Sequence, residues 1–375
     1  RDRKGRVVEN IAQVSAARPG KDLQVSLDMR LQYIAYRSLA AAIEKHKASS
    51  GSAVLLDAQT GEILALVNLP SYNPNSRNKN SAETRRNRAI TDVFEPGSTV
   101  KPFTIAAAME RGLFSDKSRV NTAPGYMKVT GHAIKDHHNY GVLSLAGILR
   151  KSSNVGASKV AQAMTPEELW RAFSDYGFGE IPGVSFPAES AGYLRHFTDW
   201  HPLDHATAAF GYGLSVSTLQ LARSYAIFAS AGKLRPVSLL KVDESPEGDQ
   251  VMSAVTSKAV LEMLEQVVGP RGTARSAAIK GYRVAGKTGT IKKNVKGAYL
   301  EDSYAAIFAG IVPVSNPRLV MAVMVNEPRE NGYYGGQVAA PVFHEVVTHA
   351  LRLMNIAPDD LSAIQQVAQA GESKV

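Results

Sequence analysis

The sequence predicts an α+β domain built around an antiparallel sheet. Segments rich in Val, Leu and Ile, typical of strands, occur near both ends of the 375-residue chain, at 52–57, 62–69, 282–287, 303–312 and 318–326. The region between them, about 104–275, is mostly helical in pattern. Because strands and helices do not alternate, a parallel α/β sheet is not expected. The two groups of strands should share one sheet, with a helical subdomain inserted between them.

The N-terminal third begins with a short linker or the remnant of an upstream domain, residues 1–25. A helix is predicted over 28–47, because Asp28 can cap it and Leu31, Ile34, Leu39 and Ile43 recur near helical spacing. The strands at 52–57 and 62–69 follow, joined by the turn 58–61. Residues 70–90, with two prolines, several Asn and an arginine cluster, should form a polar loop.

The next helix should begin near Gly97–Ser98 and end near Arg111. It is apolar on nearly all sides, which predicts that it is buried. Further helices are expected over 155–164, 166–176 and 218–231, and an amphipathic helix over 338–354 closes the domain. We therefore expect a main domain at 26–355 and a polar C-terminal tail at 356–375.

Composition excludes several chemistries. The chain has no Cys, which excludes disulfides, thiol catalysis and thiolate metal sites. Its formal charge of +9 predicts a basic surface, but no aromatic-basic motif accompanies the charge, so nucleic-acid binding is not expected. The histidines form no HExxH motif, and neither a metal nor a cofactor is expected. No apolar run approaches the ~18–20 residues that span a bilayer.

Three short motifs, in the order SxxK, SxN and KTG, carry the chemistry. They are Ser98-Thr99-Val100-Lys101, Ser152-Ser153-Asn154 and Lys287-Thr288-Gly289-Thr290. Ser98 and Lys101 share one face of a helix, so the serine can be a nucleophile and the lysine its base. That role requires a lowered lysine pKa, which burial and a second cation such as Lys287 would provide.

The other two motifs can complete an acyl-transfer site. Ser152 and Asn154 are expected to begin a helix; their role is either plain capping, or proton transfer to a leaving amine and binding of a substrate amide. The KTG motif is expected at the end of the strand 282–287, and Lys287 with the hydroxyls of Thr288 and Thr290 on an edge strand can hold a carboxylate. Gly289 allows close backbone approach. The backbone N–H groups of Thr290 and Ser98 would form an oxyanion hole.

Competing motifs are weaker. Ser76-Arg77-Asn78-Lys79 also matches SxxK, but it lies in the polar loop without a helix after it. Residues 281–288 match GxxxxGK[ST], yet their interior favours a strand and no helical pattern follows, so nucleotide binding is not expected. Gly211-Tyr212-Gly213 is a lone GxG that indicates a turn.

At these motifs the chain resembles the penicillin-binding protein and serine β-lactamase superfamily. The stretches 54–65, 70–74 and Phe94-Glu95-Pro96-Gly97 before the serine resemble class B penicillin-binding proteins, and the last resembles their septal group, often called penicillin-binding protein 3. The resemblance covers about 25–355. It implies a five-stranded antiparallel sheet flanked by helices, with a large helical insertion.

The resemblance also implies an activity, peptidoglycan D,D-transpeptidation through a serine ester, inhibited covalently by β-lactams. By the matched motifs the roles fall on Ser98, Lys101, Ser152, Asn154, Lys287, Thr288, Gly289 and Thr290. Tyr333 and Gly335 follow the last strand, where the family often has an aromatic-lined loop at the cleft. Stem peptides would be the substrates, and a membrane glycan polymerase and division proteins the partners.

A bacterial inner-membrane anchor, with the catalytic domain in the periplasm, is part of the same expectation. The polar start without Met suggests that this chain begins inside such a longer protein. Alternatives within the fold are a D,D-carboxypeptidase, a penicillin-sensing receptor domain and a β-lactamase. The class A β-lactamase pattern Glu-x-x-x-Asn is not met at Glu189, which is followed four residues later by Tyr193.

Overall fold

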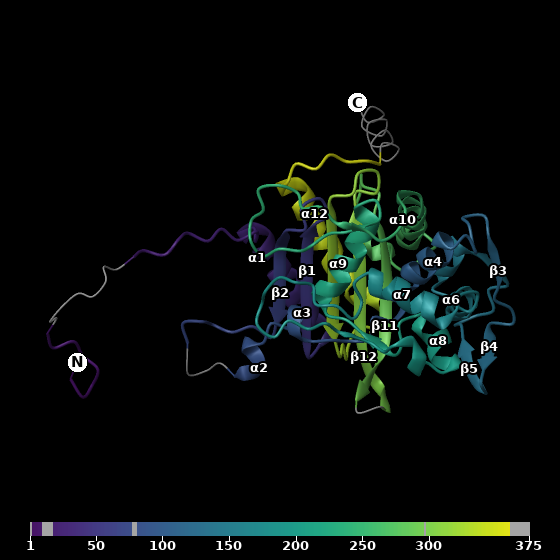
Figure 1. The fold of residues 1–375 in the computed structure, drawn as a ribbon, viewed down its shortest axis with the longest axis horizontal. Coiled ribbons are helices and arrows are strands. Elements are labelled where there is room, and N and C mark those ends of the chain that lie inside the picture. The colour runs from purple at the N-terminus through teal and green to yellow at the C-terminus, as the bar shows by residue number, and fades with distance from the viewer. Residues whose placement is uncertain (1, 10–17, 77–80, 296–297, 361–375) are drawn as a thin grey trace.

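A five-stranded antiparallel sheet forms the centre of the molecule (Figure 1). The computed structural model describes residues 2–9, 18–76, 81–295 and 298–360. The sheet has the order β11-β12-β13-β1-β2, with bounds Ala285–Val295, Ala298–Val312, Leu319–Asn326, Ser50–Asp57 and Ile63–Leu69. The predicted α+β class is confirmed, and both ends of the chain contribute to one sheet.

The junction between the two groups of strands is the pairing of β1 with β13. It runs in register from Ser50 opposite Asn326 to Asp57 opposite Leu319. Nearly every residue of both strands is buried, because helices cover the two faces of the sheet. This burial explains why these strands read as continuous apolar runs instead of alternating patterns. The strand order leaves β11 and β2 as the two edges of the sheet.

Helices cover the sheet on both sides. The helix α1 (Met29–His46) packs with α12 (Ala340–Leu353) and contacts β2, whereas α9 (Thr218–Ala229) contacts β13, β1 and β12. The helix α10 (Ala254–Val268) contacts β11. Asp28 caps α1 as predicted, because its carboxylate accepts hydrogen bonds from the backbone N–H groups of Arg30 and Leu31.

The helical insertion lies beside the β11 edge (Figure 1). It contains η2 (Gly97–Val100), α4 (Lys101–Glu110), α5 (Leu145–Lys151), α6 (Asn154–Ala161), α7 (Pro166–Asp175), η3 (Phe197–Asp199) and α8 (Pro202–Ala208). The predicted burial of α4 is confirmed: all residues from Lys101 to Ala108 are buried. The ring of Phe103 packs against those of Phe178 and Phe228, with centroids 5.0 and 4.9 Å away.

The middle of the chain also contains short strands that the helical prediction missed. They form four two-stranded pairs: β3 (Arg119–Asn121) with β6 (Val142–Ser144), β4 (Tyr126–Val129) with β5 (His132–Lys135), β7 (Tyr193–Leu194) with β8 (Leu214–Ser215), and β9 (Lys233–Leu234) with β10 (Asp249–Gln250). Strands of two to four residues are too short to show a period. Short helical turns η4 (Arg275–Ala277) and α11 (Gly335–Val338) complete the fold.

The prediction of an uninterrupted polar loop over 70–90 is wrong. Two helical turns, α2 (Ala82–Arg85) and α3 (Arg88–Thr91), lie in it. The guanidinium of Arg88 is buried and forms ion pairs with Glu83 and Asp92, so part of the arginine cluster belongs to the folded structure. Residues 77–79 of the competing SxxK match lie outside the described residues.

Residues just outside both ends of the predicted domain bond to its body. The N–H of Lys241 donates to the carbonyl of Gln24, and the hydroxyl of Tyr282 donates to the carbonyl of Ile356. The carboxylate of Asp359 accepts from the N–H of Arg283. The domain boundaries at 25 and 355 stay predictions, and residues 361–375 of the tail lie outside the described part. No described helix is both long enough and apolar enough to cross a bilayer.

Candidate active site

Ser98 lies at the tip of the buried helix, as predicted, but the first turn is a 3₁₀ turn. The N–H of Lys101 donates to the carbonyl of Ser98. In an α-helix that carbonyl would accept from residue 102, which is proline and has no N–H. The tighter turn therefore satisfies the carbonyl and presents the Ser98 side chain at the end of α4.

Close backbone packing holds this turn in place. The N–H of Gly97 donates to the carbonyl of Gly211, 3.3 Å away. Gly211 has φ +88°, and a Cβ on it would lie 2.2 Å from the carbonyl oxygen of Gly97. The buried hydroxyl of Tyr225 donates to the carbonyl of Thr99 over 2.7 Å. The Gly211–Gly213 segment is thus a turn, as predicted, and it supports the serine.

Lys101 is fully buried beneath the cleft. Its Nζ donates to the carbonyl of Ser152 at 2.6 Å, to Oδ1 of Asn154 at 2.8 Å and to Oγ of Ser152 at 3.2 Å. Burial lowers the pKa of Lys101 well below its usual range, and the charge of Lys287 lowers it further. Lys101 needs such a lowered pKa if it is to act as a base.

The second buried lysine approaches the same serine from β11. Nζ of Lys287 donates to Oγ of Ser152 and to the carbonyl of Thr288, both at 3.0 Å. Burial lowers the pKa of Lys287 to about 7. The Ser152 hydroxyl therefore contacts two amines whose pKa values are both lowered by burial.

The prediction that Ser152 and Asn154 together begin a helix is wrong. Ser152 ends α5 in the left-handed conformation, with φ 56° and its N–H bonded to the carbonyls of Ile148 and Leu149. Ser153 caps α6, and Asn154 is the first residue of that helix. The turn between two helices places the Ser152 hydroxyl and the Asn154 amide beside Lys101.

Asp136, which the sequence analysis missed, anchors this turn. It follows β5, and its carboxylate accepts from Oγ of Ser153 at 2.5 Å and from the N–H groups of Asn154 and Val155 at 2.6 and 3.0 Å. These bonds satisfy donors at the N-terminus of α6. The charge of Asp136 also raises the pKa of Lys101, against the larger effect of burial.

The third motif lies within β11, at the edge of the sheet. The strand begins at Ala285 and continues to Val295, so the predictions of a strand at 282–287 and of a motif at its end are wrong. A Cβ on Gly289 would lie 3.0 Å from the carbonyl oxygen of Pro96, which agrees with close approach. Thr288 Oγ1 lies 3.1 Å from Thr273 Oγ1. Thr290 Oγ1 accepts from the N–H of Gly335.

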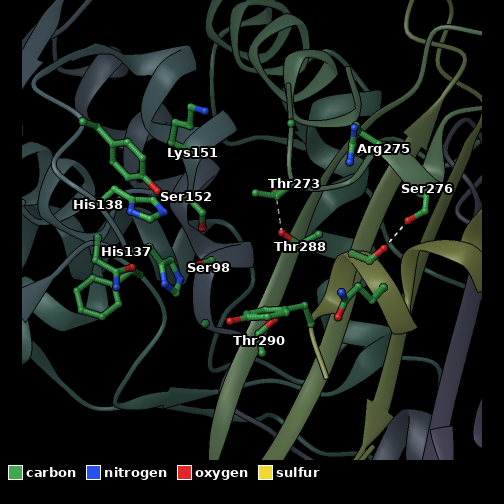
Figure 2. Close-up of a pocket in the computed structure, with 18 of the residues that line it drawn as sticks. Ser98, His137, His138, Lys151, Ser152, Thr273, Arg275, Ser276, Thr288 and Thr290 are labelled. Carbon is green, nitrogen blue, oxygen red and sulfur yellow. Dashed lines mark hydrogen bonds between the residues drawn. The ribbon is translucent and has the colours of Figure 1, made fainter. Parts of the chain in front are cut away.

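These segments face one cleft of about 1140 Å³ (Figure 2). Its lining includes Gly97, Ser98, His137, His138, Tyr140, Lys151, Ser152, Asn154, Phe210, Tyr212, Gly272, Thr273, Arg275, Ser276, Thr288, Thr290, Tyr334, Gly336 and Gln337. Lys101 and Lys287 lie beneath this surface. Tyr333 and Gly335 stand beside it: the Tyr333 ring stacks on Tyr304 at 4.2 Å, and it is Tyr334 that lines the cleft.

The competing site motifs find little support in the geometry. Residues 285–288 of the GxxxxGK[ST] match are extended in β11 and continue as strand, whereas a P-loop leads into a helix. Among the described residues, no group of three or more His, Asp or Glu side chains could hold a metal ion.

The site combines a serine at a helix tip, two buried lysines with lowered pKa values and an edge strand carrying hydroxyls. Together these groups suit acyl transfer through a serine ester. The fold and the site thus define a serine acyltransferase of the α+β kind. Residues 51–348 match the family model "Penicillin binding protein transpeptidase domain". The chain belongs to the penicillin-binding protein transpeptidase family.

Relatives in this family are similar over nearly the whole chain. The chain is 46% identical to "Peptidoglycan D,D-transpeptidase FtsI" of Escherichia coli K12, covering 96% of this chain and 61% of that protein. It is 44% identical to "Probable peptidoglycan D,D-transpeptidase PenA" of Neisseria flavescens, covering 96% and 90%. The chain thus spans less than two thirds of the Escherichia coli relative.

A solved structure agrees with the fold. The "TP domain" of penicillin-binding protein 3 from Burkholderia pseudomallei superposes with a TM-score of 0.83 at 43% identity, covering 91% of this chain and 99% of that one. The predicted fold and family are confirmed.

Proposed function

We propose that this chain is the catalytic part of a peptidoglycan D,D-transpeptidase that cross-links stem peptides at the division septum. Ser98 Oγ attacks the penultimate D-Ala carbonyl of a donor peptide and gives its proton to neutral Lys101. The N–H groups of Ser98 and Thr290 stabilise the oxyanion. The amine of the terminal D-Ala leaves with a proton delivered through Ser152.

The second half of the reaction restores the free enzyme. The amine of a neighbouring stem peptide attacks the Ser98 ester and loses a proton, the new amide forms, and Ser98 regains its hydrogen. A β-lactam undergoes only the first half, because its opened ring stays on the serine and blocks the acceptor. Asn154 would bind the donor amide, and Thr288 with Thr290 its carboxylate. Gly289, Tyr333 and Gly335 remain predicted neighbours of the ligand.

One observation carries the proposal: the hydroxyl of Ser152 lies within hydrogen-bond reach of Nζ of both Lys101 and Lys287. Such a relay can carry the serine proton from the base to the leaving amine, which must be protonated to depart. Plain helix capping by Ser152 does not explain why two buried amines converge on it.

The cellular setting follows from the same family. We infer a bacterial inner-membrane protein whose catalytic domain lies in the periplasm, where stem peptides and β-lactams are met. A membrane glycan polymerase and division proteins would be its partners. The support is the resemblance to the septal group and the name FtsI of a relative that is 46% identical.

A thioester donor tests the reaction itself. An N-acyl-D-alanyl thioester should acylate the domain and pass its acyl group to an added D-amino acid, giving a new amide seen by mass spectrometry. Hydrolysis without transfer would indicate a carboxypeptidase, and a stable ester that neither water nor amine releases would indicate a receptor. A penicilloyl ester that turns over in seconds would indicate a β-lactamase.

A further inference from the structure

The segment that leads into Ser98 is bonded to the segment that joins α8 to α9. Phe94 and Val216 exchange two backbone hydrogen bonds, with N···O distances of 3.0 and 2.9 Å. Closer to the serine, the N–H of Gly97 donates to the carbonyl of Gly211. The two segments therefore lie side by side up to the residue before Ser98.

Glu95 adds a side-chain bond between the same two segments. Its Oε1 accepts from the N–H of Gly213, which is 3.0 Å away and 118 residues later in the chain. Gly211 and Gly213 both have positive φ, 88° and 76°. A turn with two glycines in the left-handed region loses much conformational entropy when it becomes ordered, so bonds from outside the turn are needed to hold it.

The carboxylate of Glu95 lies close to the cleft without lining it. Tyr212, between the two glycines, lines the cleft, and burial and the charge of Glu95 raise the pKa of its phenol. Among the described residues that line the cleft, Gly97 and Ser98 are present and Glu95 is not. An effect of Glu95 on the reaction therefore has to pass through the backbone that it holds.

We propose that Glu95 is a positioning residue that fixes the Ser98 turn by accepting the N–H of Gly213. This rests on the proposed function, in which Ser98 supplies both the nucleophile and one N–H of the oxyanion hole. The carbonyl of Gly97 and the N–H of Ser98 belong to one planar peptide group. Gly211 packs against that carbonyl, since a Cβ on it would lie 2.2 Å from the oxygen. A shift of the 211–213 turn therefore tilts the peptide group that carries the oxyanion donor.

This role requires an acceptor oxygen at the right reach and does not require its charge. Glu95→Gln keeps an oxygen at the same reach and removes the charge. Glu95→Asp keeps the charge and withdraws the oxygen by one methylene, and Glu95→Ala removes the acceptor altogether. The three variants thus separate hydrogen-bond geometry from electrostatics.

The test measures acylation by fluorescent penicillin over a range of concentrations. It gives the maximal rate of ester formation and, separately, the concentration of half-maximal rate. Glu95→Ala should lower the maximal rate about 10-fold and leave the half-maximal concentration nearly unchanged. The loss is smaller than the ~10²-fold of a 1 Å misplacement, because Gly97 and Tyr225 still hold the turn. Glu95→Gln should retain most of the rate, and Glu95→Asp should lie between.

Glu189→Ala is the matched control. The carboxylate of Glu189 also accepts the N–H of a glycine, Gly183, at 2.8 Å, but within its own loop and six residues away in sequence. Its loss should leave the maximal rate as in the wild type. A wild-type maximal rate in Glu95→Ala, whatever its unfolding temperature, or a Glu95→Gln as slow as Glu95→Ala, would overturn the inference while leaving Ser98 as the nucleophile. A wild-type protein that penicillin does not acylate would overturn the proposed function, and this inference with it.

Discussion

Nζ of Lys287 lies 3.0 Å from Oγ of Ser152, and the same oxygen lies 3.2 Å from Nζ of Lys101. The three atoms come from segments that are far apart in sequence, yet they form one connected chain of hydrogen bonds. Two ammonium groups so close together disfavour each other's charge. One proton can therefore be shared over the three groups.

Replacing Lys101 by Met should slow acylation by penicillin by about 10²–10⁴, the usual contribution of a general base. The fold should survive, because the apolar chain keeps the volume of the lysine stem. Stopped-flow or gel measurements with fluorescent penicillin give the rate, and thermal unfolding checks the structure. Acylation at the wild-type rate would remove Lys101 as the base.

Replacing Lys287 by Met should shift the pH dependence of acylation. The base form of Lys101 is neutral, so the rate falls as pH drops through the pKa of Lys101. The charge of Lys287 lowers that pKa, and its removal should raise it, which moves the acid limb of the profile to higher pH. The second-order rate constant of acylation is measured from pH 5 to 10. The pH at which it falls locates the acid limb, whereas a loss of affinity lowers the rate constant at every pH.

Asp136→Asn should move the acid limb of the same pH profile in the opposite direction, to lower pH. The carboxylate raises the pKa of Lys101, so its neutralisation should lower that pKa and extend activity to lower pH. The amide keeps one oxygen as acceptor for the N-terminus of α6. Asp136→Ala removes both acceptors and should also cost about 1–3 kcal/mol of unfolding free energy. A profile unchanged in Asp136→Asn would mean that the residue has a structural role alone.

Stability should rise with pH between 7 and 9. In the unfolded chain Lys287 has an ordinary lysine pKa, and in the folded protein burial lowers it to about 7, so the unfolded state binds more protons in this window. The contribution is about 2 kcal/mol over the two pH units. Lys101 also has a lowered pKa and adds to this rise, so urea unfolding at pH 7, 8 and 9 should show at least this increase, and Lys287→Met should reduce the slope without abolishing it. Lys258→Met, an exposed control, should retain the wild-type slope.

Gly211→Ala should displace the turn that carries Ser98. The new methyl group would lie 2.2 Å from the carbonyl oxygen of Gly97, so the backbone must move. We expect acylation to slow by about 10²-fold, as for a misplacement of about 1 Å. Gly213→Ala is the matched control: it also has positive φ, +76°, but nothing within 4 Å, so it should cost stability of about 1–2 kcal/mol and leave acylation near normal.

Much of this arrangement could be predicted from the sequence because it depends on local pattern. The central strands β1 and β13 are buried on both faces and read as apolar runs, and α4 is apolar all round because it is enclosed. The motif at Ser98 could be placed on a helix tip, and the burial that lowers the pKa of Lys101 followed from the composition of that helix.

The rest depends on contacts that no local pattern carries. Asp136 caps α6 from another segment, and Gly211 supports Ser98 across more than a hundred residues. Asp136 belongs to no motif, and the lone GxG at Gly211 indicated a turn without showing what the turn contacts. The left-handed conformation of Ser152 arises where α5 and α6 meet, so a capping pattern alone assigned it to the wrong helix. Asp136 stands immediately before His137 and His138, but nothing in the sequence shows which groups it contacts.

The claim that the three motifs converge on Ser98 is tested most directly by intact mass after brief penicillin treatment, with peptide mapping of the adduct. We predict one penicilloyl group per chain, on the peptide that contains Ser98, stable for minutes or longer. Ser98→Ala should unfold at the wild-type temperature and gain no mass. An adduct on another residue, or the same gain of mass in Ser98→Ala, would contradict the account.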